Sequence, residues 1–145
     1  MTLPTQPPVV RVTRRFAASA ERVFDAFVDP EKAGRFLFAT ATGQMVRAEV
    51  DPRVGGRYLF VDRRPEGDAE HFGEYLEIDR PRRLVFTFAV PAFSAERTRV
   101  SIDIVPRGAG CELTLTHEGV PPDYAERTQG GWATILDGLE RVIDA

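Results

Sequence analysis

The sequence predicts an α+β domain in which a curved antiparallel sheet wraps around a long C-terminal helix. One observation is an apolar stripe at helical spacing near the end of the chain, formed by Trp132, Ile135, Leu136, Leu139, Val142 and Ile143. Another is a series of segments between residues 46 and 118 that alternate apolar and polar side chains and are joined by short turns. Successive hairpins make a sheet antiparallel, and a sheet of about seven strands curls strongly.

The N-terminal part is expected to supply one strand and two short helices. Residues 9–16 are rich in β-branched side chains and follow a polar, proline-rich leader at 1–8. Ser19 is a suitable N-cap for a helix with apolar residues at Ala20, Val23, Phe24 and Phe27. Asp29 then caps a second helix that begins at Pro30, because proline is tolerated at the first helical position. The buried edge of this second helix is expected at Ala33, Phe36 and Leu37.

Six further strands are expected before the final helix. The first starts after Gly43 and places Val46, Ala48 and Val50 on one face. Further strands are predicted at 57–63, 70–78 and 84–90, with loops at 51–56, 65–68, 79–81 and 91–96. The clearest alternation is at 98–104 and 111–118, on either side of a glycine-containing turn at 108–110. Two prolines at 121–122 end the sheet pattern. The sequence shows no internal repeat, linker or low-complexity segment, so we expect residues 9–145 to form a single domain.

Composition and charge exclude several classes of function. The chain has 145 residues, a net charge of −3 and basic residues scattered among acids, so nucleic acid is not an expected partner. Its one cysteine cannot form an internal disulfide, and no apolar run is long enough to insert in a membrane. Two histidines without a metal-binding motif predict neither a metal nor another cofactor. We therefore expect a cytoplasmic protein that is a monomer or a homodimer.

Several short motifs follow one another in a specific order along the chain. Residues 20–27, followed by Asp29-Pro30-Glu31, resemble the first helix of the START-like helix-grip superfamily (SRPBCC). Residues 54–58 (Val-Gly-Gly-Arg-Tyr), 73–78, 81–87, 115–119 and 131–132 resemble the branch named after the activator of Hsp90 ATPase. The resemblance implies a seven-stranded sheet gripping the C-terminal helix, with an apolar cavity between them. The sequence departs from the branch at 35–38, Arg-Phe-Leu-Phe, where a tryptophan pair is common, and at Asp62, where an apolar residue is usual.

Aromatic side chains are the leading candidates for a ligand-binding surface. Tyr58 with Phe60, and Phe86 with Phe88, are spaced by two and so share one side of their strands. One helix cannot fill the concave face of a long curled sheet, so we expect a groove or cavity there. The predicted ligand-binding residues are Phe24, Phe27, Phe36, Tyr58, Phe60, Phe86, Phe88, Ile102, Leu115, His117, Trp132 and Leu136. The alternative for the same residues is an ordinary packed core.

Two polar residues are weak candidates for catalysis. His117 shares a face with Leu113 and Leu115, where it either meets a ligand's polar group, acts as an acid or base, or is a core-edge histidine bonded to backbone. Cys111 lies roughly 20 Å away along the same strand, so the two form no dyad. The spacing of His71 indicates no partner. Asp62 shares the face of Tyr58 but lies near a strand end, where we expect it to be hydrated; burial would require a partner.

Two local features remain open from the sequence. The face occupied by Tyr75 conflicts with that of Phe72, Leu76 and Ile78, which a bulge near Gly73 would resolve. Gly130-Gly131 precedes Trp132, and indicates either a kink or late helix start, or a flexible gate or close backbone approach at the cavity.

Three functions follow as hypotheses. The first is binding of a small apolar or aromatic molecule between the sheet and the C-terminal helix. The second is a cofactor-free cyclase, hydrolase or isomerase that uses His117, with Tyr58 or Asp62, as acid and base. The third, implied by the family name alone, is an interaction module acting on a chaperone. A carrier should show a mostly apolar lining, an enzyme converging titratable groups, and an interaction module a large exposed apolar patch.

Overall fold

The computed structural model describes residues 9–38, 42–89, 98–120 and 122–144. In chain order the elements are β1 (Val9–Phe16), α1 (Ala20–Val28), α2 (Pro30–Phe36), β2 (Gln44–Val50), β3 (Arg57–Arg64), β4 (Gly67–Asp79), β5 (Arg83–Phe88), β6 (Thr98–Arg107), β7 (Gly110–Glu118), a 3₁₀ turn η1 (Pro122–Tyr124) and α3 (Ala125–Asp144). The expected leader at 1–8 and the expected loop at 91–96 lie outside the described residues.

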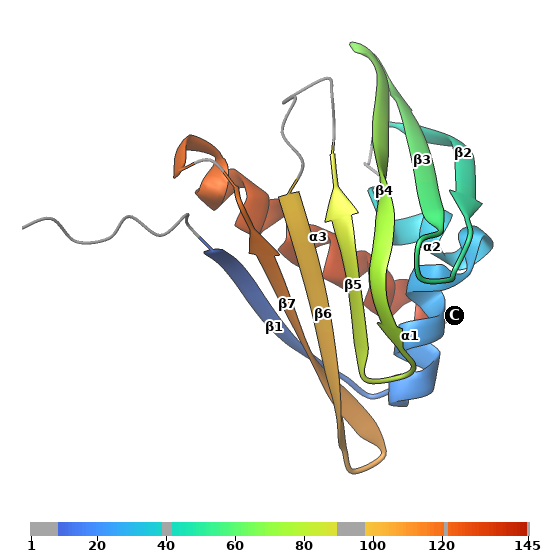
Figure 1. Ribbon diagram of the computed structural model, residues 1–145, viewed down its shortest axis with the longest axis vertical. Coiled ribbons are helices and arrows are strands. Elements are labelled where there is room, and N and C mark those ends of the chain that lie inside the picture. Colours follow the sequence, from blue (N-terminus) through green and yellow to red (C-terminus); the bar gives the residue numbers. More distant parts are fainter. Residues whose placement is uncertain (1–8, 39–41, 90–97, 121, 145) are drawn as a thin grey trace, which may run out of the picture.

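All seven strands form one antiparallel sheet in the order β1-β7-β6-β5-β4-β3-β2. Figure 1 shows the sheet curving around α3, with α1 and α2 near its β2 end. The first two strands in sequence therefore lie at opposite edges, and α1 and α2 connect them. The predicted fold class, a curved sheet around the C-terminal helix, is confirmed.

Local capping explains where the two short helices begin. The Ser19 side chain accepts a hydrogen bond from the Arg22 amide at 3.3 Å, and Asp29 accepts one from the Glu31 amide at 3.0 Å. Pro30 occupies the first turn of α2, as predicted. These caps turn the chain sharply, so that Phe27 and Phe36 pack edge to face with ring centroids 5.3 Å apart.

The C-terminal helix α3 does not start late, after its two consecutive glycines, which was one alternative that the sequence allowed. It begins at Ala125 and continues through Gly130 and Gly131, so a late start is wrong. A close backbone approach at these glycines is also wrong, because a Cβ at either would meet nothing within 4 Å. The close approach is at Gly138, where a Cβ would lie 3.2 Å from Cβ of Phe36 in α2. The predicted stripe is confirmed: Trp132, Leu136, Leu139 and Ile143 are buried.

Two irregularities in strand pairing change the predicted faces. In β2 the register shifts between Met45 and Arg47, so Met45 joins Ala48 against the core and Val46 is exposed, contrary to expectation. In β4 the register shifts between Tyr75 and Glu77. That bulge places both Tyr75 and Ile78 against the core, which resolves the conflict seen in the sequence.

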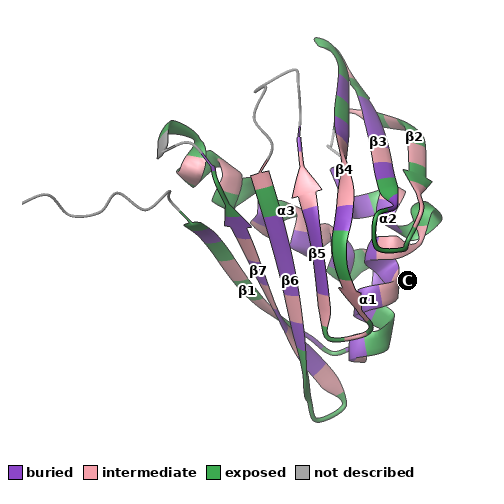
Figure 2. Cartoon of the chain, in the orientation of Figure 1, coloured by how far each residue is buried: buried purple, intermediate pink, exposed green. Residues whose placement is uncertain are grey.

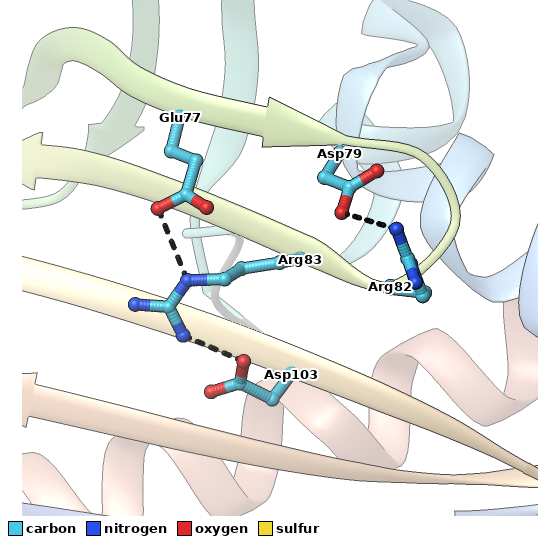
Figure 3. Close-up of polar contacts among 5 residues, drawn as sticks. All are labelled: Glu77, Asp79, Arg82, Arg83 and Asp103. Carbon is cyan, nitrogen blue, oxygen red and sulfur yellow. Dashed lines mark hydrogen bonds and ion pairs between the residues drawn. The ribbon is translucent and has the colours of Figure 1, made fainter.

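The outer face of the sheet carries ion pairs. Arg83 in β5 donates to Glu77 in β4 at 3.1 Å and to Asp103 in β6 at 2.6 Å, as Figure 3 shows, and Arg82 pairs with Asp79 in the adjoining turn. Figure 2 shows that buried residues run along the central strands, with exposed residues concentrated at edges and hairpin ends. The core therefore lies between the concave face and the helices.

Candidate functional site

Phe38 occupies the centre of a group of rings between the sheet and α3. Its ring is stacked on His71 (centroids 4.5 Å apart, planes at 8°) and on Phe88 (5.1 Å, 14°), with Tyr58 at 6.2 Å and 17°. Phe60 and Trp132 approach it at steep angles, 63° and 64°. We call the space enclosed by these partner rings, His71, Phe88, Tyr58, Phe60 and Trp132, the ring slot.

The end of α2 turns Phe38 into this position. The helix ends at Phe36, and Leu37 closes it by donating its amide hydrogen to the Ala33 carbonyl at 2.7 Å. Phe38 then has φ +63°, a left-handed conformation that a non-glycine residue seldom adopts. Only 4% of Phe38 is exposed. Burial of its ring therefore offsets the unfavourable backbone conformation.

His117, on β7, is held by a chain of side-chain hydrogen bonds. Trp132 Nε1 donates to His117 Nδ1 at 2.9 Å, and Thr98 Oγ1 lies 2.6 Å from His117 Nε2. The Thr98 hydroxyl donates to the Phe88 carbonyl, so it accepts from Nε2–H, which fixes the tautomer. Burial lowers the pKa of His117 to about 4. Both ring nitrogens of this neutral imidazole are therefore used within the protein.

A buried ion pair lies near His71, which is one of the ring-slot residues. The His71 imidazole lies 3.4 Å from the Phe60 carbonyl, and burial, with the nearby Arg64 charge, lowers its pKa to about 4. Asp62 is fully buried, so its expected hydration is wrong. Its carboxylate accepts a hydrogen bond from Arg64 Nε at 2.8 Å, which supplies the partner that burial requires.

A second group of residues lines a cavity beside the ring slot. The cavity has a volume of about 10 Å³ and is lined by Phe27, Leu37, Tyr58, Phe60, Tyr75, Leu84 and Phe86. That volume is roughly the space of one water, far below the several hundred Å³ of a typical ligand pocket. The Tyr58 hydroxyl donates to the Thr87 carbonyl at 2.7 Å, and burial raises the pKa of Tyr58 well above its usual value.

The predicted ligand-binding residues fall into three sets. Phe88 and His117 meet Trp132 in or beside the ring slot, and Tyr58 and Phe60 belong to both the ring slot and the cavity. Phe27 and Phe86 line the cavity. The remaining five are buried in the same core without lining this cavity: Phe24, Phe36, Ile102, Leu115 and Leu136.

Sequence reasoning missed the central residue and several of its neighbours. Phe38 follows the predicted second helix, and neither strand nor helix periodicity places a residue in that position. His71 lies on the same buried face of β4 as Ala69, two residues before it, and Tyr75, four residues after it. The sequence left the face of Tyr75 open, so this spacing did not identify His71 as buried. The other missed residues are Leu37, Tyr75, Leu84 and Thr98.

Other kinds of site are less well supported within the described ranges. No group of three or more potential metal-ligating side chains is found in that part of the chain. None of the described helices is long and apolar enough to cross a membrane. In the part of the chain that the structure describes, the large exposed apolar side chains come from six separate segments: Val9, Val46, Val54, Leu76, Val105 and Tyr124.

Comparison with known proteins agrees with this architecture. CV1439 from Chromobacterium violaceum is 26% identical, with 94% of this chain and 97% of that chain covered and a TM-score of 0.86. The AHSA1-like protein from Aeromonas hydrophila is 21% identical, with 94% and 92% covered and a TM-score of 0.80. CalU16 from Micromonospora echinospora is 22% identical, with 99% and 81% covered and a TM-score of 0.73.

No curated protein matches the chain. The sequence model of one family, described as activator of Hsp90 ATPase homolog 1-like protein, matches residues 17–144, which is most of the chain. The resemblance noted from the short motifs is thereby confirmed, and the chain belongs to this family.

Proposed function

We propose that this protein binds a small apolar or aromatic molecule between the concave face of the sheet and α3. One observation carries the proposal: rings from β3, β4, β5 and α3 converge on a space that is occupied by one residue from outside those elements, Phe38. A core built only for stability would normally be filled by the elements that face it. The surroundings are apolar, and both nearby histidines are neutral at pH 7.

The arrangement of hydrogen bonds favours binding over catalysis. An acid or base needs a ring nitrogen within reach of a substrate proton. His117 already bonds to Trp132 and Thr98, and Asp62 is paired with Arg64. A cyclase or hydrolase built on these residues would have to break buried hydrogen bonds first. The interaction-module hypothesis gains no support from the large exposed apolar side chains of the described residues, which come from six separate segments.

Two measurements test the proposal. Native mass spectrometry of protein purified from its own host should detect a bound small molecule by its added mass. Titration with fatty acids, sterols and flat polyphenols should change the emission of Trp132, the single tryptophan, whose ring centroid lies 5.9 Å from Phe38 and 6.0 Å from Phe88. The proposal is wrong if nothing co-purifies and all three ligand classes leave the emission unaltered.

A further inference from the structure

We infer that the ring slot is the binding subsite for a flat aromatic ring, and that the Phe38 side chain is an internal competitor which the ligand must displace. This inference rests on the proposed function. Beyond that function, it specifies that the ligand is a flat aromatic molecule and that Phe38 limits the affinity of the protein for this ligand.

The geometry of the ring slot selects planar molecules. His71 and Phe88 lie within 14° of parallel to the Phe38 ring at centroid distances of 4.5 Å and 5.1 Å, which are stacking distances. Phe60 and Trp132 meet the Phe38 ring at steep angles. His71 and Phe88 are themselves nearly parallel, with planes at 22° and centroids 6.0 Å apart, so they lie side by side against one face of the Phe38 ring. This flat surface with edge-on neighbours matches an aromatic ring, whereas a puckered saturated ring makes poorer contact with it.

The backbone makes Phe38 a displaceable occupant. It lies beyond the end of α2 and before β2, so it belongs to neither a helix nor a strand. Its positive φ costs free energy of the same order as burial of a phenylalanine ring contributes. A backbone change that returns φ of Phe38 to a negative value would relieve that strain and withdraw the ring, so a conformation with the ring slot open is accessible to a ligand.

The neighbouring cavity extends the subsite. Tyr58 and Phe60 contact the Phe38 ring and also line the cavity of about 10 Å³. Withdrawal of Phe38 would thus leave one ring-sized space beside existing empty volume. The cavity itself holds only about one water, so the vacated space accepts one aromatic ring of a neutral ligand, and a second, fused ring requires the side chains that line the cavity to move.

The experiment compares 2-naphthol with decahydro-2-naphthol, which has the same carbon skeleton and hydroxyl but is not flat. Each is titrated by calorimetry into the wild-type protein and Phe38→Gly, because glycine adopts positive φ without strain. If the open state is populated below about a tenth, removing the competitor should tighten naphthol binding by about tenfold or more. Decahydro-2-naphthol should bind more weakly than naphthol to both proteins. Nuclear Overhauser contacts should join naphthol to the His71 imidazole in the variant.

A matched control separates a built subsite from any hole in the core. Leu113→Ala opens space at a fully buried position on β7, four residues from His117. It should leave naphthol affinity unchanged; tightening equal to that of Phe38→Gly would overturn the inference. Equal naphthol affinity in wild type and Phe38→Gly would overturn the competitor role while leaving the proposed function intact. No binding of naphthol to either protein would overturn the inference, whereas a co-purifying aliphatic ligand would still support the proposed function. Phe38→Leu provides a second folded variant, with intermediate affinity expected.

Discussion

The Thr98 hydroxyl links the His117 side chain to the Phe88 carbonyl, and a single substitution tests this link. Thr98→Val keeps the shape but leaves His117 Nε2–H and the Phe88 carbonyl without this partner. We expect a loss of about 1–3 kcal/mol in the free energy of unfolding, measured by urea denaturation. Thr13→Val is the control, because its hydroxyl makes only an exposed contact with Thr114 at 3.4 Å. Equal, small losses in both variants would contradict the hydrogen-bond chain.

For individual residues, the sequence predicted which face of a strand a side chain occupies better than it predicted which residue that side chain contacts. Strand alternation correctly placed His117 with Leu113 and Leu115, and Asp62 with Tyr58 and Phe60. It did not predict that His117 meets Trp132, because the contact depends on how α3 rotates against β7. Strand alternation could have predicted the partner of Asp62, because Arg64 lies two positions further along β3 and so is on the same face. Phe38 could not be predicted, since its position depends on the backbone conformation of a single residue.

At the scale of an element, the glycines of α3 have opposite roles. Gly131→Ala should raise the free energy of unfolding by up to about 1 kcal/mol, since alanine favours a helix and the added methyl group meets nothing within 4 Å. Gly138→Ala should gain less or lose stability, because its Cβ would lie 3.2 Å from Cβ of Phe36. Thermal unfolding measures both. A destabilised Gly131→Ala, or one with altered ligand exchange, would indicate that flexibility in this turn of the helix matters.

The elements themselves were largely predictable, and their irregularities were not. The strand at Val9–Phe16 and both short helices have the expected positions because caps and β-branched residues act locally. The bulges in β2 and β4 depend on pairing with the neighbouring strand, which no single segment encodes. For the same reason Val46 was assigned to the wrong face, whereas a bulge could be suspected near Gly73 from conflicting parities.

At the scale of the whole molecule, the two buried histidines predict loss of stability in mild acid. Their pKa is lowered from 6.5 to about 4 in the folded state, so the unfolded chain takes up protons first as the pH falls. Stability should be complete above pH 6.5, fall between pH 6.5 and about 4, and lose about 3 kcal/mol for each histidine. Urea unfolding at pH values across this range measures the loss.

His71→Phe serves as the control for that prediction. It keeps a ring against Phe38 but removes one titrating group, and the chain has only two histidines. The slope between pH 6.5 and 5 should therefore be about half that of the wild type. Asp25 does not interfere, since hydrogen bonds from Arg80 lower its pKa below 3.8 and its contribution disappears only in stronger acid. An unchanged slope would contradict the assignment to His71.

The order of strands also bears on how the chain is synthesised. Among the described strands, β1 is at the edge of the sheet and pairs with β7 alone, with Val9 opposite Glu118 and Phe16 opposite Cys111. On the ribosome, β1 must therefore wait, with its backbone amides unsatisfied by any partner strand, until the two helices and five strands described between it and β7, and then β7 itself, have been translated.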